Sequence, residues 1–450
     1  MVVFCLIVVV LLMVALPLLT GRPTGIVTLF SAGLLFHTLA ISLLMKSGIL
    51  GVSDAQLLSS WTIAVALVAV AILWASQLLR VEDLRAFRTP AVSLIAKLFL
   101  LAYLALALVW YVGNPDMALF KLYVGFLPFL MAGYYIGHFM YQREAEKLIR
   151  LLMAIMGIVT SFALVEYAIG DEFWSGAGFF DNYLKLSLPD FQYTEGFLGN
   201  FYTSLNHRRF VSIFANPLIH GTLTAICLTY AIVYWLQTRG IRPLRAAYIL
   251  LLGGLGIVSV YFSYSRGALL MLLPVSAYLF FRVGGFGKVL FVLLGIAGLA
   301  VNYRYLIHTL SFGDDSALVH ITAIRNAWNE LPRCVLGCGF GSGYGESYFM
   351  GMLVEMGVPA FSLLAGALLL ISISMVRARK KVSDPAAISL FTGTLLCLAG
   401  LSINSVFSEL FGVIRATAVF WILLGVAFRF SESGMDHTAP TALNRRGETT

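Results

Sequence analysis

A single arginine interrupts a long apolar stretch of the sequence. Arg266 is the only charged residue between positions 246 and 281. An ionisable side chain at membrane depth costs several kcal/mol unless it is paired or reaches water, so it marks a candidate functional site. The tripeptide Ser265-Arg266-Gly267 divides the stretch into two apolar segments. We therefore expect Arg266 at a membrane surface, where it can meet an anionic substrate.

Further arginines occur in segments that we assign to the outer side of the membrane. Arginine carries a planar fork of N–H donors that suits phosphate and carboxylate groups, and it stays charged at any relevant pH. Several arginines converging at one membrane surface would bind a multiply charged anion such as a lipid pyrophosphate. The alternative is that each pairs with a local carboxylate, such as Asp181, Asp314, Asp315 or Glu330. The outer arginines are Arg208, Arg209, Arg266, Arg304, Arg325 and Arg333.

The segment 304–349 holds several candidates for a general base, which takes a proton from an attacking group. They are the carboxylates Glu346, Glu330, Asp314 and Asp315 and the histidines His308 and His320. Glu346 is preferred because it follows a glycine-rich turn and precedes an apolar segment that begins near Met350. This position is at the membrane surface, where a lipid-linked substrate would lie. The alternative for Glu346 is a helix N-terminal acid favoured by the helix dipole. His320 lies on a predicted short helix. It could act as a base, or it could be a solvated histidine of the loop, and the sequence favours neither alternative.

The composition shows what kind of scaffold must position these residues. Of the 450 residues, 60% are hydrophobic and 12% are charged, whereas soluble domains carry about 25% charged residues. The apolar runs are long enough to cross a hydrocarbon core of ~30 Å as helices of about 20 residues. They do not alternate as the strands of a membrane barrel would. The sequence therefore predicts an all-α, polytopic helical membrane protein.

Thirteen apolar segments can be distinguished, and twelve is the alternative if the first does not span. We therefore predict about 12–13 transmembrane helices in a single integral membrane domain over residues 1–430. The polar tail, 431–450, is predicted to be cytoplasmic and disordered. The segments lie near 1–19, 26–45, 57–78, 91–112, 118–140, 148–170, 213–237, 246–264, 267–283, 288–303, 350–375, 386–405 and 411–428.

Basic residues set the expected orientation. No basic residue precedes the first apolar segment and Arg22 follows it, which favours an outer N-terminus and an inner C-terminus. Two long loops then lie on the outer side, at about 171–212 and 304–349, the second of them before the last three segments. Most other basic residues fall in short inner loops, such as the run at 377–381. The net charge of +8 is therefore typical of membrane topology and does not indicate nucleic acid.

The sequence indicates no metal and no cofactor. There are five cysteines but no CxxC or histidine-rich ligand pattern. No P-loop or dinucleotide fingerprint is present, so we expect chemistry on the outer face without ATP or sugar nucleotides. Cys334 and Cys338 lie in the outer loop at 304–349, where a disulfide is one of two open alternatives.

Three motifs between about residues 205 and 360 occur in the order of a known family. The first enters a span from Arg209 to Pro217, and the second runs from Tyr264 through Arg266 to Leu269. The third is Leu336-Gly337-Cys338-Gly339-Phe340-Gly341, followed by Glu346-Ser347-Tyr348-Phe349 and by the run from Leu353 to Pro359. With these motifs the chain resembles the O-antigen ligase/O-antigen polymerase (Wzy-type) superfamily of bacterial envelope enzymes. The first 200 residues match only as a row of spans.

The resemblance implies a metal-independent, inverting glycosyltransferase of the bacterial inner membrane, with its active site facing the periplasm. Such enzymes move a glycan from a polyprenyl pyrophosphate carrier to an acceptor hydroxyl, and they use no cofactor. The implied partners are the lipid-linked glycan, the bilayer and a chain-length regulator protein. The implied catalytic residues are Glu346, His320, Arg266 and Arg325. The implied pyrophosphate-binding residues are Arg208, Arg209, Arg266, Arg304 and Arg325.

The position of Glu346 separates the branches of this family. Ligases tend to carry a histidine just before the span that follows the large loop, whereas Gly345-Glu346-Ser347 stands here and is more similar to the acidic polymerase branch. His320 stands where the family has an arginine early in the loop helix. We expect a polymerase of lipid-linked repeat units, with a ligase that transfers a finished glycan to lipid A-core or protein as the alternative. An anion transporter is disfavoured because most charges flank the apolar segments; Lys97 is the clearest exception.

Overall fold

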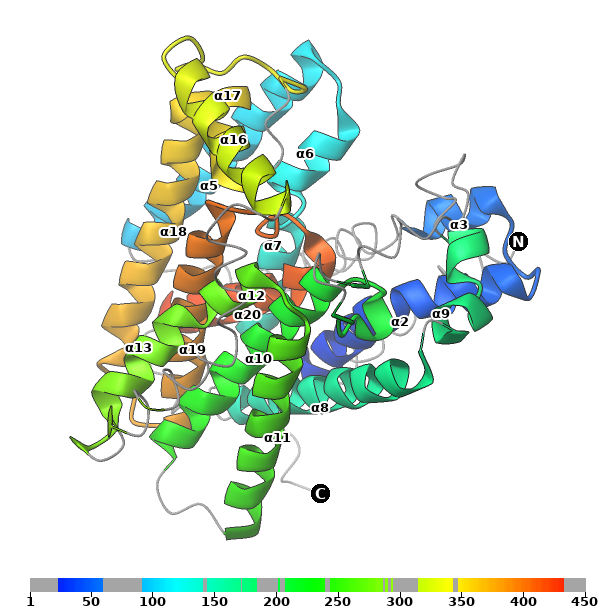
Figure 1. Cartoon of the computed structure of the whole chain (residues 1–450). Coiled ribbons are helices and arrows are strands. Elements are labelled where there is room, and N and C mark those ends of the chain that lie inside the picture. The colour runs from blue at the N-terminus through cyan, green and yellow to red at the C-terminus, as the bar shows by residue number, and fades with distance from the viewer. Residues whose placement is uncertain are drawn as a thin grey trace, which may run out of the picture.

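The computed structural model is an assembly of helices (Figure 1). It describes residues 23–59, 91–140, 144–170, 172–183, 201–202, 207–238, 243–285, 288–289, 293, 315–342 and 347–432. About 81% is helical, and the described residues contain no strand, apart from one isolated bridge between Tyr202 and Arg208. The predicted all-α class is confirmed.

In the described part of the chain, seven helical segments are long and apolar enough to cross a membrane, which confirms a polytopic membrane protein. They are α5 (Ala91–Gly113), the pair α6 (Met117–Val124) and α7 (Leu127–Phe139), α8 (Ala145–Ile169), α10 (Pro217–Gln237), α18 (Gly357–Arg379), α19 (Pro385–Ser405) and α20 (Ile414–Glu432). Shorter apolar stretches occur in α2 (Pro23–Lys46) and α11 (Pro243–Phe262).

The predicted number of spans stays a prediction. The segments near 1–19, 57–78 and 288–303 lie wholly or almost wholly outside the described residues. The same holds for the tail beyond Glu432. The remaining helices are shorter: α3 (Val52–Ser59), α9 (Glu172–Gly176), α12 (Arg266–Met271), α13 (Leu273–Arg282), α16 (Asp315–Glu330), α17 (Tyr348–Glu355), the π-helix η3 (Phe179–Tyr183) and the 3-10 turn η6 (Ser212–Phe214).

Three predicted segments are each divided into two helices, and a proline or glycine explains each division. Pro128 is near the start of α7 and Pro274 is near the start of α13. A proline has no N–H with which to continue the preceding helix. Between α17 and α18 the break is at Gly357, whose φ of 83° is a left-handed conformation that favours glycine.

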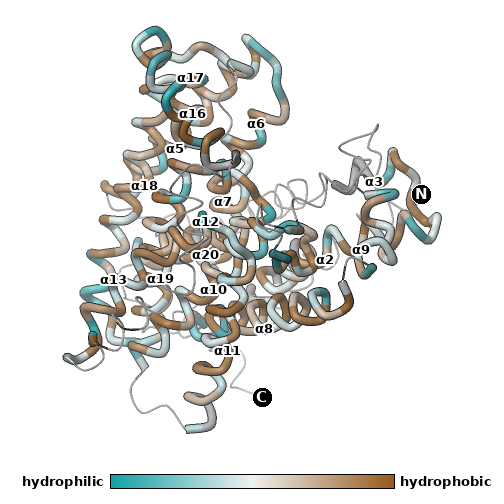
Figure 2. Tube along the Cα trace, viewed as in Figure 1, coloured by the Kyte–Doolittle hydropathy of each residue, from teal (hydrophilic) through white to brown (hydrophobic). Residues whose placement is uncertain are grey.

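The long helices pack through close backbone contacts and a core of aromatic rings. Figure 2 shows apolar residues along the long helices. The backbones of α7 and α20 touch, because a Cβ on Gly133 or Gly425 would collide with backbone atoms of the other helix. Phe126 packs on Trp421, with ring centroids 4.5 Å apart, and both side chains are fully buried. A smaller cluster joins α2 to the aromatic segment after α8 through Trp174.

Lys97 belongs to an ion-pair network that joins α5, α7 and α20. Its Nζ lies 2.8 Å from Glu432 Oε1 and donates to the Tyr134 hydroxyl at 2.7 Å. The Tyr134 hydroxyl donates to the same carboxylate. Arg429 lies 3.3 Å from Glu432 Oε2 and 2.9 Å from His138 Nδ1. The lysine is therefore paired within the bundle.

The bundle has one strongly basic end, and the connectivity of α18 and α19 locates it. The basic run 377–381 lies in the last turn of α18 and in the turn that follows it, whereas the start of α18 and the end of α19 lie at the opposite end. At that opposite end, the Ser347 hydroxyl donates to the carbonyl of Val406 just beyond α19, at 2.7 Å. Candidate site residues gather at this second end.

Candidate functional site

Two of the three sequence motifs lie side by side. Phe210 N donates to Phe262 O at 2.9 Å, and the two rings are stacked with centroids 5.2 Å apart. The segment 207–211 therefore runs along the end of α11. It then turns into α10, where the Asn216 side chain accepts from the first backbone N–H groups and Pro217 occupies the first turn. An asparagine cap followed by a proline in the first turn is a common way for a helix to begin.

Arg209 holds the turn that precedes Arg266. Its Nε donates to Ser263 O at 3.0 Å and its Nη2 donates to Tyr264 O at 3.5 Å. Tyr264 has φ of 47°, a left-handed conformation that is costly for a bulky residue. Ser265 then caps α12, with its hydroxyl accepting from Ala268 N at 3.3 Å. Arg266 is the first residue of α12 and its side chain is half-buried.

The start of α12 is wedged between α10 and α19. A Cβ on Gly221 of α10 would lie 2.6 Å from Ser263 Oγ, so only glycine permits this approach. On the other side, a Cβ on Gly267 would collide with the side-chain amide of Asn404. The residue after Arg266 is thus packed directly on Asn404 of α19.

Asn404 was not a candidate from sequence. Its side chain is fully buried, and within the described part of the chain neither its Oδ1 nor its Nδ2 has a hydrogen-bond partner. Buried polar groups are nearly always hydrogen-bonded, so each exception needs an explanation. The signal that could have identified Asn404 is an amide near the outer end of an apolar segment.

The start of α17 is tied to the end of α19 beside Asn404. Tyr348 N donates to Ser408 O at 3.2 Å, and the buried Tyr348 hydroxyl donates to Tyr123 O at 3.0 Å. Burial raises the pKa of the Tyr348 phenol well above its usual value, with the neighbouring tyrosines as lesser causes. Glu346 lies two residues earlier, outside the described residues, as does Arg304. Their predicted roles stay predictions.

Arg208 points away from its neighbour Arg209 and binds a buried carboxylate. Its Nη2 lies 3.0 Å from Glu166 Oε1 and donates also to the Glu166 carbonyl at 3.3 Å. The Glu166 side chain is fully buried in α8. The guanidinium also lies 5.5 Å from the Tyr167 ring centre. Arg208 therefore pairs with a carboxylate of the protein, as the alternative to substrate binding expected. The carboxylate is Glu166 of α8 and not a loop residue such as Asp181.

Arg325 and His320 lie on α16, which packs on α17. Arg325 is exposed and His320 is half-buried. Five residues along a helix correspond to a rotation of ~500°, so the two side chains project in directions about 140° apart. The structure thus places them on different faces of α16, whereas Arg209 binds the turn that leads into Arg266.

The glycine-rich third motif is folded onto the junction between α17 and α18. Cys334 and Cys338 form a disulfide, which answers the question that the sequence left open. Cys338 N donates to Val354 O at 2.8 Å, and Val358 N donates to Val335 O at 2.9 Å. Gly337 has φ of 103° and packs against the backbone of this junction.

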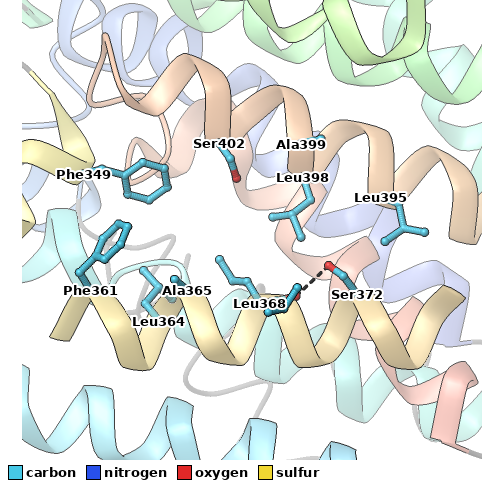
Figure 3. Close-up of a pocket in the computed structure, with 11 residues that line it drawn as sticks. Phe349, Phe361, Leu364, Ala365, Leu368, Ser372, Leu395, Leu398, Ala399 and Ser402 are labelled. Carbon is cyan, nitrogen blue, oxygen red and sulfur yellow. Dashed lines mark hydrogen bonds between the residues drawn. The ribbon is translucent and has the colours of Figure 1, made fainter. Parts of the chain in front are cut away.

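An apolar groove of about 380 Å³ lies between α18 and α19. Figure 3 shows Phe349 and Phe361 at one end and Ser372 toward the other. The Phe349 end lies at the start of α17, near the candidate site. The lining residues of each helix recur every three or four positions, so one face of each helix forms the groove. They include Leu364, Leu368, Leu395, Leu398 and Ser402.

The described residues contain no group of three or more His, Cys, Asp or Glu side chains that could hold a metal ion. In comparisons with known proteins, no family model and no curated protein matches the chain. Membership of the O-antigen ligase/polymerase superfamily therefore stays a hypothesis, and the activity that it implies is a proposal.

Proposed function

We propose that this protein is a glycosyltransferase that polymerises polyprenyl-pyrophosphate-linked oligosaccharide repeat units into a surface polysaccharide or exopolysaccharide. The observation that carries the proposal is the contact between two arginine-bearing segments, in which Arg209 binds the turn that begins α12 at Arg266. This turn is at the end of the bundle opposite the basic run 377–381. By the positive-inside rule, the basic run faces the cytoplasm and Arg266 the periplasm of a bacterial inner membrane.

The chemistry needs a stabilised leaving group and a base. The acceptor oxygen attacks the anomeric carbon of the donor as the bond from that carbon to the pyrophosphate oxygen breaks. The electron pair leaves with the pyrophosphate, whose growing charge Arg266 and Arg325 stabilise. The acceptor proton passes to a base, for which Glu346 is the first candidate and His320 the second. Attack opposite the leaving group inverts the anomeric centre.

The groove between α18 and α19 supports a lipid-linked donor. It is lined mainly by leucine, alanine and phenylalanine, and such a lining suits a hydrocarbon chain. Its Phe349 end is three residues from Glu346 in the sequence. A donor lying in this groove would keep its chain in the bilayer and present its pyrophosphate near the membrane surface.

The glycan profile of a deletion strain tests the proposal. Loss of all but single repeat units on the lipid carrier is expected, with recovery of long chains on complementation. Complete polymer that accumulates on its carrier would instead favour the ligase alternative. Unchanged glycans would overturn both activities and leave the transporter class as the one to test, by anion flux into proteoliposomes.

A further inference from the structure

The side-chain amide of Asn404 lies beside the start of α12, the helix that begins with Arg266. It is packed on Gly267, the residue that follows Arg266. In α19 it is the outermost member of a stripe in which Gly393, Cys397 and Gly400 precede it at helical spacing. Gly393 packs on Tyr230 and Gly400 on the backbone of α12. The stripe therefore faces the helices that carry the candidate site, and not the groove.

The burial of this amide has an energetic cost that no protein group among the described residues offsets. An unsatisfied buried donor or acceptor destabilises the folded state because it gives up its hydrogen bonds to water, and both Oδ1 and Nδ2 of Asn404 lack a partner among the described residues. An apolar side chain of similar size would avoid this cost. A ligand that supplies the missing partners would offset this cost, and the amide lies beside a candidate catalytic arginine.

The type of partner follows from the amide itself. Arginine only donates hydrogen bonds, so Arg209 and Arg266 suit the oxygens of an anion. An amide both donates and accepts, and its Oδ1 finds no partner in a bare pyrophosphate. A sugar offers an oxygen acceptor next to a hydroxyl or acetamido N–H donor. We propose that Asn404 recognises the first sugar of the donor, the one attached to pyrophosphate. This inference rests on the proposed function. Oδ1 accepts from its hydroxyl or N–H group, and Nδ2 donates to the adjacent oxygen.

Access to the amide requires movement of α12. The start of this helix covers Asn404. The helix has six residues, between the left-handed Tyr264 and the proline at the start of α13. Recognition of the sugar therefore requires this short unit to shift when the pyrophosphate engages Arg266, so that the amide becomes exposed to the attached sugar.

Two probes separate recognition of the sugar from recognition of the pyrophosphate. The first is polyprenyl pyrophosphate without a glycan, and the second is the lipid-linked repeat unit extracted from the deletion strain. Binding of each to the purified full-length protein is measured in detergent. Asn404→Leu is expected to weaken binding of the lipid-linked repeat unit by about tenfold to a hundredfold, the effect of one or two hydrogen bonds. Binding of bare polyprenyl pyrophosphate is expected to stay within twofold of the parent protein.

Thr392→Val is the matched control, because it also removes a buried polar atom of α19 that has no partner among the described residues. Thr392 lies 12 residues from Asn404, or about 18 Å along the helix, and its substitution should leave both affinities unchanged. Asn404→Leu should unfold at the same or a higher temperature, since it removes unpaired polar atoms. If leucine prevents folding, Asn404→Ala provides the same comparison without added bulk.

The outcomes distinguish the two levels of the proposal. Equal weakening of both probes, or of neither, overturns the role of Asn404 and leaves the proposed function standing. If the parent protein binds neither probe, the proposed function and this inference both fail. Transfer assays with the repeat unit add a second readout, in which the loss for Asn404→Leu should lie mainly in KM of the donor.

Discussion

Replacement of Arg208 by methionine should destabilise the protein and should not remove a substrate contact. The perturbation leaves Glu166 without its guanidinium partner, 3.0 Å away, in a position where the carboxylate side chain is fully buried. The Arg208 side chain is itself only 15% exposed, so solvent screens the pair weakly. Breaking a buried pair by removing one partner typically costs about 3–5 kcal/mol. The folded population would fall by more than about a hundredfold relative to the unfolded one.

Removing the charges of both Arg208 and Glu166 should recover most of the stability that Arg208→Met loses. Replacement of a buried ion pair by packed apolar groups is often neutral or stabilising by roughly 1–4 kcal/mol. We therefore expect Arg208→Met with Glu166→Leu to be close to the parent protein in stability. The four proteins form a double-mutant cycle, and equilibrium unfolding by SDS in mixed micelles gives the coupling energy.

Activity of the double variant decides between a structural and a substrate-binding Arg208. If the pair is structural, the double variant regains long-chain glycan together with its stability. A double variant that is stable and well inserted but makes no long chains would refute this reasoning. It would return Arg208 to the pyrophosphate-binding set that the sequence predicts.

Three further predictions concern catalysis and the opposite end of the bundle. Arg266→Ala and Arg325→Ala should each abolish long-chain product while the protein remains in the membrane fraction; normal chain length in either would remove that arginine from the site. Glu346→Gln should slow transfer at neutral pH with little change in thermal stability, and full activity would exclude Glu346 as the base. Lys97→Met should cost about 1.5–3 kcal/mol of unfolding free energy, the value of hydrogen bonds to a charged group. A stability equal to that of the parent would show that Glu432 does not need this lysine.

The fold class was predictable because it depends on composition. A chain with 12% charged residues and long apolar runs has few alternatives to a helical membrane protein. Helix breaks were harder to predict. Pro128 and Pro274 are visible in the sequence, but each stands inside a continuous apolar run, and a proline near a helix start is compatible with one kinked span or with two helices. The left-handed Tyr264 has no local signal, since tertiary contacts with Arg209 hold it.

The candidate site was predictable in part. The type and isolation of Arg266 indicated a site, but its position relative to Arg209 depends on how α10 and α11 pack across 54 residues of sequence. The sequence did not identify the partner of Arg208, since the carboxylates nearest to the outer arginines in sequence are those of the loops. Glu166 lies inside an apolar segment, where its charge requires a partner from elsewhere. Asn404 carries no charge, so its type did not distinguish it from the other polar residues of the apolar segments.

The contact between α7 and α20 has a consequence for biogenesis. α20 leaves the ribosome after every other helix described, yet its backbone touches that of α7 through Gly133 and Gly425. Until α20 inserts, this face of α7 must be covered by lipid or by the insertion machinery. During the same interval Lys97 lacks the carboxylate of Glu432 as its partner. Closure of the bundle is therefore a late event of synthesis. A chain that stops before α20 would present to quality control both a helix face shaped for close backbone contact and an unpaired charge.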